Sequence, residues 1–232
     1  MATPWTLESE LCGLAETAGV GEALCRLGIV KGAESEPRIE ELHGWVRGGA
    51  ETFIYRFRVA ERDTVHDVML KAIVAFSTAR SLEELGLEWL ARRRLLQAEG
   101  VWTPQLYYMG RALIIEEFIP EALSSHLRER RGRNPHLEDQ VIHYAAALQK
   151  HGFSPLSPFH GLRTDGRNVF AVDFGQDLGP PKLSARRRGR RLLREAIEWL
   201  NSAGCEPVDE RRAAAVFAFH VADEKIEGKA RV

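Results

Sequence analysis

Two charged residues stand inside or at the end of otherwise apolar segments. Lys71 lies between Val68-Met69-Leu70 and Ala72-Ile73-Val74, and Asp173 follows an apolar run and precedes Phe174-Gly175. A buried ammonium group is costly in free energy unless a carboxylate pairs with it. A carboxylate at a strand end can hold Mg²⁺, which prefers oxygen ligands and often shares them with substrate phosphates. Asp173 is therefore a candidate magnesium ligand, and Lys71 is a charged group that needs a partner.

Each of these residues also has a purely structural interpretation. Lys71 could sit on an edge strand and extend its ammonium group to water. If it is buried instead, the next predicted helix offers two partner carboxylates, Glu88 first and Glu84 second. Asp173 and its two followers could form an ordinary turn.

Two further segments could contact a nucleotide. Gly44, Gly48 and Gly49 precede a predicted strand, and glycines allow backbone N–H groups to approach phosphate closely. The segment Glu116-Glu117-Phe118-Ile119-Pro120 ends an apolar strand, where backbone groups could hydrogen-bond to an adenine. Taken alone, each segment is equally typical of a turn or a strand end.

The hydrophobic pattern indicates which elements position these residues. Apolar positions at helical spacing predict helices over Thr6–Leu27, Ser81–Ala98, Leu137–Lys150, Ser184–Ala203 and Arg211–Glu227. Runs rich in β-branched and aromatic residues predict strands at Arg38–Trp45, Thr52–Val59, Val65–Phe76, Gln105–Met109 and Arg111–Phe118. A hairpin is expected to turn at Asp165-Gly166, with Asn168–Asp173 as its second strand. This order favours an α+β fold with two lobes, divided near Pro120.

Composition sets broad limits on the function. The 232 residues carry a net charge of −1, so no global basic field indicates nucleic acid or a membrane surface. Three cysteines, Cys12, Cys25 and Cys205, are too few and too scattered for a disulfide framework or a metal cluster. No signal peptide or transmembrane segment is evident, so we expect a cytoplasmic protein.

In their order, these features resemble the protein-kinase-like superfamily, in which a glycine loop, a strand lysine, a helix glutamate, a hinge and an Asp-Phe-Gly turn hold ATP and magnesium. Arg47-Gly48-Gly49-Ala50 and Gly100-Val101-Trp102-Thr103-Pro104 look most similar to the aminoglycoside and choline phosphotransferases. The resemblance covers roughly residues 38 to 200. It implies a small β-rich nucleotide-binding lobe over 38–119 and a helical lobe over 120–232. The helical pattern before it predicts an extra N-terminal helical segment over 1–37.

The resemblance also assigns roles to individual residues. It implies that Gly48 and Gly49 approach the nucleotide phosphates, that Lys71 contacts them, and that Glu88 orients Lys71. Asp173 would bind magnesium. The hinge would consist of Glu117, Phe118 and Ile119. ATP and Mg²⁺ are therefore the expected ligands.

One expected motif is missing. Kinases of this superfamily carry His-x-Asp with an Asn five residues after the Asp, which together orient the attacking hydroxyl and hold a second metal. Here His151-Gly152 precedes Phe153, and His160-Gly161 precedes Leu162. The remaining candidates for a catalytic role are His160 and Asp165, although Asp165 is better explained by the Asp-Gly turn. Asn168 lies too close to Asp173 in the chain to be the usual second metal ligand.

The sequence therefore leaves three functions open. The first is an atypical phosphotransferase acting on a small-molecule, sugar, lipid or protein hydroxyl, because phosphoryl transfer depends mainly on positioning and electrostatics. The second is a catalytically inactive pseudokinase that serves as a scaffold or regulatory partner. The third is a polyanion-binding protein, because six arginines between Arg186 and Arg194 crowd the start of one helix and would suit an anionic ligand.

Overall fold

The computed structural model of the chain describes residues 19–31, 38–43, 52–61, 64–73, 82–109, 113–130, 132–175, 178, 184–204 and 206–222. The chain divides into two compact units. The first contains Met1–Glu88 and Pro104–Phe118, and the second contains Trp89–Thr103 and Ile119–Val232. Helix α3 (Leu82–Ala98) therefore contributes residues to both units.

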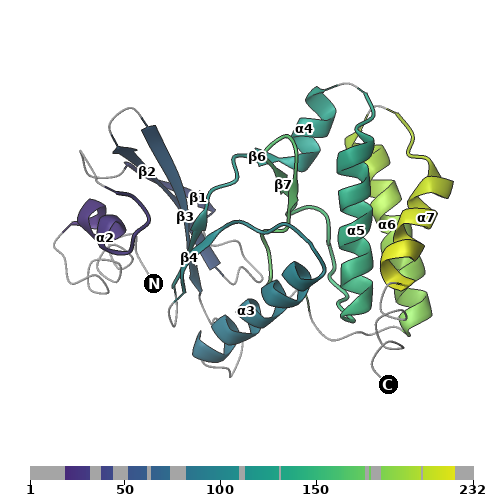
Figure 1. Cartoon of the computed structure of the whole chain (residues 1–232), viewed down its shortest axis with the longest axis horizontal. Coiled ribbons are helices and arrows are strands. Elements are labelled where there is room, and N and C mark those ends of the chain that lie inside the picture. Colours follow the sequence, from purple (N-terminus) through teal and green to yellow (C-terminus); the bar gives the residue numbers. More distant parts are fainter. Residues whose placement is uncertain are drawn as a thin grey trace, which may run out of the picture. The chain divides into compact units, whose positions relative to one another are not determined.

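The first unit is built on a five-stranded antiparallel sheet (Figure 1) with the strand order β1-β2-β3-β5-β4. Its strands are β1 (Arg38–His43), β2 (Thr52–Glu61), β3 (Thr64–Ile73), β4 (Leu106–Met109) and β5 (Leu113–Glu117). All five predicted strands are present. Consecutive strands pair with each other at β1-β2-β3 and β4-β5, as the short connections between them favour.

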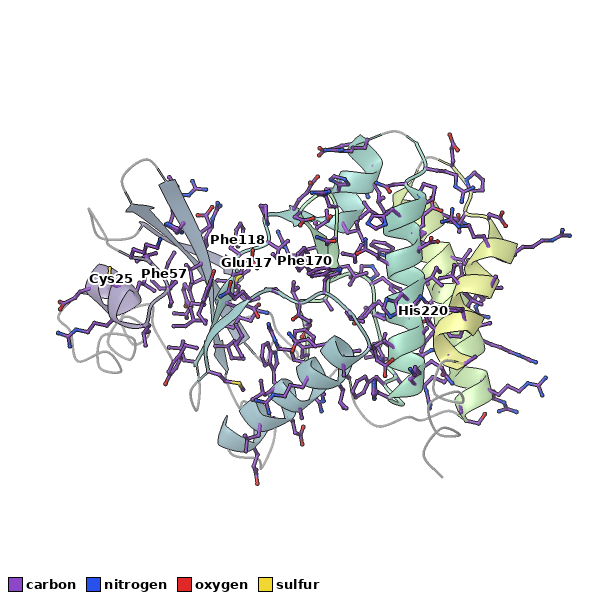
Figure 2. The ribbon with its side chains drawn as sticks, viewed as in Figure 1. Cys25, Phe57, Glu117, Phe118, Phe170 and His220 are labelled. Carbon is purple, nitrogen blue, oxygen red and sulfur yellow. The ribbon has the colours of Figure 1, made fainter. Side chains whose placement is uncertain are left out.

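The two faces of this sheet differ sharply in polarity. Tyr55 lies opposite Leu70, and Phe57 lies opposite Val68, so these four side chains share one apolar face. Helix α2 (Val20–Arg26) covers that face with Val20, Ala23 and Leu24, and these side chains form one core with the strands. Figure 2 shows Phe57 on the side of the sheet toward Cys25.

The second unit is mainly helical. Its helices, besides the second half of α3, are α4 (Leu123–Glu129), α5 (Pro135–Lys150), α6 (Ala185–Ala203) and α7 (Glu210–Ala222). Helix α5 begins where the Asn134 side chain accepts a hydrogen bond from the Leu137 N–H and where Pro135 occupies the first turn. Its buried side chains pack against α6 and α7, which both lie to the right of it in Figure 1.

A small three-stranded sheet completes the second unit, with the order β6-β7-β8. Its strands are β6 (Glu121–Ala122), β7 (Arg163–Thr164) and β8 (Val169–Phe170). The predicted hairpin at Asp165-Gly166 is confirmed, because β7 and β8 pair on either side of it. The predicted second strand, Asn168–Asp173, is wrong in length: only Val169 and Phe170 pair, and residues 171–174 have no regular structure.

The α+β class is confirmed, because the described residues form a five-stranded antiparallel sheet followed by a mainly helical part. Of the predicted helix Thr6–Leu27, the described part begins at Gly19, and helix α2 occupies Val20–Arg26 of it. The described part of Arg211–Glu227 ends at Ala222. No described helix is long and apolar enough to cross a lipid bilayer.

Candidate functional site

Lys71 lies on β3 and forms a buried ion pair in the first unit. Its Nζ is 2.5 Å from Oε1 of Glu116 on β5, and the two side chains are 7% and 1% exposed. The snorkelling interpretation of Lys71 is therefore wrong, because β3 is a central strand and the ammonium group is covered. Its partner is thus Glu116 on the neighbouring strand, a residue that was not predicted as the partner of Lys71.

The register of the sheet explains this pairing. Lys71 lies opposite Ile114 and Met69 lies opposite Glu116, so Lys71 and Glu116 are diagonal neighbours on the same face. Diagonal positions on adjacent strands are about 7–8 Å apart, a distance that a lysine and a glutamate side chain bridge together. Glu116 could have been found from the sequence only by fixing the register of two strands that are more than 40 residues apart.

The face that carries Lys71 and Glu116 also holds other charged groups. The Asp67 carboxylate accepts hydrogen bonds from Arg56 and Arg58, with its shortest contact 2.5 Å from Arg56 Nη2. Burial alone would raise the pKa of Asp67, but the two guanidinium groups outweigh burial and lower it. The Arg56 guanidinium lies 4.3 Å above the centre of the Phe118 ring. This face is therefore charged where the opposite face is apolar.

The predicted hinge segment uses part of its backbone hydrogen-bonding capacity. The Glu117 N–H donates to the Gln105 carbonyl, and the Glu117 carboxylate accepts the Gln105 N–H. The Ile119 carbonyl accepts from Arg163 Nε at 2.5 Å. The N–H of Ile119, a residue only 3% exposed, has no partner among the described residues. A buried backbone donor without a partner is uncommon and suits a ligand acceptor.

Asp173 lies on a turn that is fixed by its neighbours in the second unit. Phe174 is fully buried and meets the Trp89 ring edge-on, with 5.0 Å between ring centres. Arg92 Nη1 donates to the carbonyls of Phe174 and Gly175, at 3.2 and 2.5 Å. Both Trp89 and Arg92 belong to α3. This helix therefore holds the turn through the Phe174 ring and through the backbone carbonyls of Phe174 and Gly175. The Asp173 side chain stays exposed and accepts the Gly175 N–H at 3.1 Å.

Gly161 lies close to Asp173, whereas the exposed His160 beside it makes no contact with Asp173 among those the structure shows for the described residues. A Cβ atom added to Gly161 would lie 3.7 Å from the Asp173 Cβ. Asp165 instead caps the β7–β8 turn, where it accepts the N–H groups of Arg167 and Asn168 and the Asn168 side chain. Burial alone would raise the pKa of Asp165, but these hydrogen bonds prevail and lower it. Asp165 thus has the turn role that its Asp-Gly sequence indicates.

Leu162 occupies the place where a kinase-like loop would carry its catalytic Asp. Its side chain is 2% exposed, and its backbone bonds to Phe159 and Leu123 tie it to the core. Asn168, the residue that superficially resembles the second metal ligand, is held by Asp165 at the far end of the hairpin. This position therefore holds a buried apolar side chain in place of an accessible carboxylate.

Asp173 fits magnesium only in combination with other ligands. No group of three or more His, Cys, Asp or Glu side chains could hold a metal ion in the described part of the chain. Mg²⁺ is commonly bound by one or two carboxylates together with substrate phosphates and waters. A single exposed carboxylate on a fixed turn matches that mode, so Asp173 fits a metal that arrives with a nucleotide.

The arginine cluster divides into inward and outward side chains. Arg188 is buried and donates to the Gln149 carbonyl, and Arg191 donates to the Pro155 carbonyl. Both therefore fasten α6 to the rest of the second unit. The other four are exposed: Arg186, Arg187, Arg190 and Arg194. Of these, Arg194 lies 3.6 Å from the Glu198 carboxylate. The number of arginines open to an anionic ligand is thus smaller than the sequence implied.

Two sequence predictions have no structural outcome. Gly48 and Gly49, together with Gly44, lie outside the described residues. Glu88 is half-buried on α3 and, like Lys71, has interactions beyond those given above, so its role in orienting Lys71 stays a prediction.

The sequence matches no protein-family model, and a search of curated proteins finds no match. Among solved structures, the Rio2 kinase from Chaetomium thermophilum is similar to this chain at 14% sequence identity and a TM-score of 0.44, with 84% of this chain and 72% of the Rio2 chain covered.

Proposed function

We propose that this protein is a kinase-like protein that binds ATP with magnesium. Lys71 would contact the nucleotide phosphates, and Asp173 would hold the metal together with phosphate oxygens and water. The Ile119 N–H would donate to the adenine. Magnesium would supply positive charge to neutralise the phosphates, and the chain's own residues would bind and orient the nucleotide.

The Asp173 turn carries this proposal. Exposed carboxylates are common, but this one stands on a backbone that is fixed at three points: the buried Phe174 ring and the two carbonyls bonded to Arg92. Fixing a ligand residue in advance reduces the entropy lost when the metal binds. The fixed backbone around Asp173 thus favours a role in which the carboxylate must stand at a defined position, as in binding a metal.

The Lys71–Glu116 pair supports the proposal independently. A buried ion pair adds little stability compared with apolar side chains of similar volume. The sheet therefore gains little stability from a lysine at this position. Contact with a phosphate group would give the ammonium group a function that an apolar side chain lacks.

Thermal denaturation with and without Mg²⁺ and ATP tests the proposal. A ligand at a hundred times its Kd stabilises the native state by about 2.7 kcal/mol, so we expect a clear rise in Tm that requires both components. Asp173→Asn should abolish the rise. Glu198→Gln, which removes an exposed carboxylate on α6, is the matched control and should leave the rise unchanged. A cooperative transition with no shift would refute nucleotide binding.

A second candidate, a catalytically inactive pseudokinase, is favoured by one observation. Leu162 is buried where the base is expected, and Asp165 is engaged in its turn. Hydrolysis of radiolabelled ATP by the wild type, measured against Asp173→Asn, separates the candidates. A rate above that of the variant supports an atypical phosphotransferase, whereas equal rates with an intact Tm rise support a nucleotide-binding pseudokinase.

A further inference from the structure

A pocket in the second unit lies beside Asp173, and we call it the Tyr144 pocket. Its described lining includes Tyr144, Ser157, Leu162, Ala171, Asp173 and Leu178, together with two prolines. Three of these side chains are polar: a phenol, a hydroxyl and a carboxylate. The remaining walls are mostly apolar, and the cavity volume of about 30 Å³ admits the hydroxyl end of a molecule rather than a whole polyol.

The Tyr144 hydroxyl has an unusual environment. The residue is only 4% exposed, and its ring packs edge-on against Phe159. Its hydroxyl nevertheless makes no hydrogen bond with any described residue, and it is not among the oxygens sealed from solvent. Buried tyrosine hydroxyls usually find a partner. This one therefore opens into the pocket with its hydrogen-bonding capacity unused.

The charge of Asp173 reaches this hydroxyl. Burial first, and then the Asp173 carboxylate, raise the pKa of Tyr144, so the phenol stays protonated at neutral pH and can donate a hydrogen bond. The carboxylate can only accept hydrogen bonds, and it has lone pairs beyond the one used by the Gly175 N–H. The pocket thus offers a donor and an acceptor that are not bonded to each other.

A hydroxyl group satisfies both groups at once, because its oxygen accepts a hydrogen bond while its hydrogen donates one. Asp173 is the only charged residue among the described lining residues of the Tyr144 pocket. An anionic molecule would be repelled by this carboxylate, and the arginines that reach the neighbouring backbone, Arg92 and Arg191, direct their guanidinium groups at carbonyl oxygens, so the pocket disfavours anions.

We propose that the Tyr144 pocket is a binding subsite for an uncharged alcohol, whose hydroxyl is held between the Tyr144 hydroxyl and the Asp173 carboxylate. That this alcohol is the phosphate acceptor rests on the proposed nucleotide function, because Asp173 would then face both the metal-bound nucleotide and the alcohol. This assigns the acceptor to neutral polyols and similar alcohols rather than to phosphate esters or anionic lipid head groups.

NMR of the full chain, with ¹³C at the tyrosine ζ carbons and no nucleotide present, tests the proposal. The chain has four tyrosines, and Tyr144→Phe assigns the signal of interest. Two matched pairs of probes differ in one charged group: glycerol against glycerol phosphate, and inositol against inositol phosphate. We expect the neutral probes to shift the Tyr144 signal saturably and the esters to bind at least tenfold more weakly.

Variants separate the subsite from a general effect on the fold. Asp173→Asn should weaken binding of the neutral probes about tenfold and reduce the discrimination against the esters. Tyr108→Phe, which removes a tyrosine hydroxyl in the first unit, should leave the Tyr144 shift unchanged. If Tyr144→Phe does not fold, variants of the other three tyrosines assign its signal by elimination.

The outcomes are distinct from those of the nucleotide experiment. No saturable shift with either neutral probe, or equal affinity for the esters, would overturn the alcohol subsite even if Mg²⁺ and ATP raise the Tm. A saturable, charge-selective shift in a protein that does not respond to nucleotide would support the subsite and refute its role in phosphoryl transfer.

Discussion

Lys71 and Asp173 are held in opposite ways. In the first unit, the Lys71 charge itself is buried, and Glu116 neutralises it within the sheet. In the second unit, the Asp173 charge is exposed, while the neighbouring Phe174 is fully buried and fixes the backbone. One residue is thus positioned through its charge, and the other through the apolar side chain beside it.

Because of this difference, substitutions at the two residues affect the stability of the fold to different extents. Removing one partner of the Lys71–Glu116 pair leaves a buried charge without that counter-charge, which destabilises the fold strongly. Removing the Asp173 charge leaves the core untouched. Functional variants are therefore easier to interpret at Asp173 than at Lys71.

The largest expected effect comes from the anchor of the Asp173 turn. Phe174→Ala should destabilise the protein by about 4 kcal/mol, because it removes a fully buried ring and leaves a cavity beside Trp89. Urea unfolding measures this loss. Phe219→Ala, at an exposed aromatic position on α7, is the control and should change stability by no more than about 0.5 kcal/mol. A similar small change at Phe174 would contradict the anchoring role.

Glu116→Gln should reduce stability by about 3 kcal/mol, because it leaves Lys71 buried without this counter-charge. The double variant Lys71→Met/Glu116→Leu should recover most of the loss, since both charges are then absent. Urea unfolding of the three proteins measures the coupling. A loss well under 1 kcal/mol would indicate that a second carboxylate neutralises Lys71, and Glu88 would be the residue to test.

The second unit holds a less buried ionic cluster that can be compared with Lys71–Glu116. Glu99 lies 2.5 Å from Lys150 Nζ and 3.1 Å from His151 Nε2. Burial alone would raise the pKa of Glu99, but Lys150 and His151 lower it overall. A lowered folded-state pKa gives stability that is present above the ordinary value of 4.5 and is lost as the pH falls below it. Urea unfolding between pH 6 and acid should therefore show a steeper loss for wild type than for Glu99→Gln. Parallel profiles would contradict this contribution.

The smallest expected effect is that of Asp173→Asn on stability without ligands. The side chain is exposed, and an amide oxygen can still accept the Gly175 N–H, so the change should stay within about 0.5 kcal/mol. Differential scanning calorimetry without Mg²⁺ or nucleotide measures it. A large loss would mean that the carboxylate serves the fold and would weaken its assignment to a metal.

Local signals predicted much of the fold. The five strands, the helices around Ser81–Ala98 and Leu137–Lys150, and the Asp165-Gly166 turn follow from hydrophobic periodicity and turn residues, which act over a few positions. The Asp165 capping role follows in the same way, because an Asp side chain reaches the N–H groups two and three residues ahead. The length of the strand after Asn168 was overestimated, because apolar alternation does not show where a pairing partner ends.

The sequence by itself determined which residues carry unusual chemistry for their surroundings: a lysine within an apolar strand, an acid before Phe-Gly, and a leucine after His-Gly. Only the tertiary structure decided their partners. Glu116 meets Lys71 through strand register, Arg92 and Trp89 hold the Asp173 turn from a helix some 80 residues away in the chain, and Tyr144 opens its hydroxyl into a pocket beside Asp173. Contacts of this kind depend on how distant segments pack, and packing is a property of the whole chain that no short window of sequence contains.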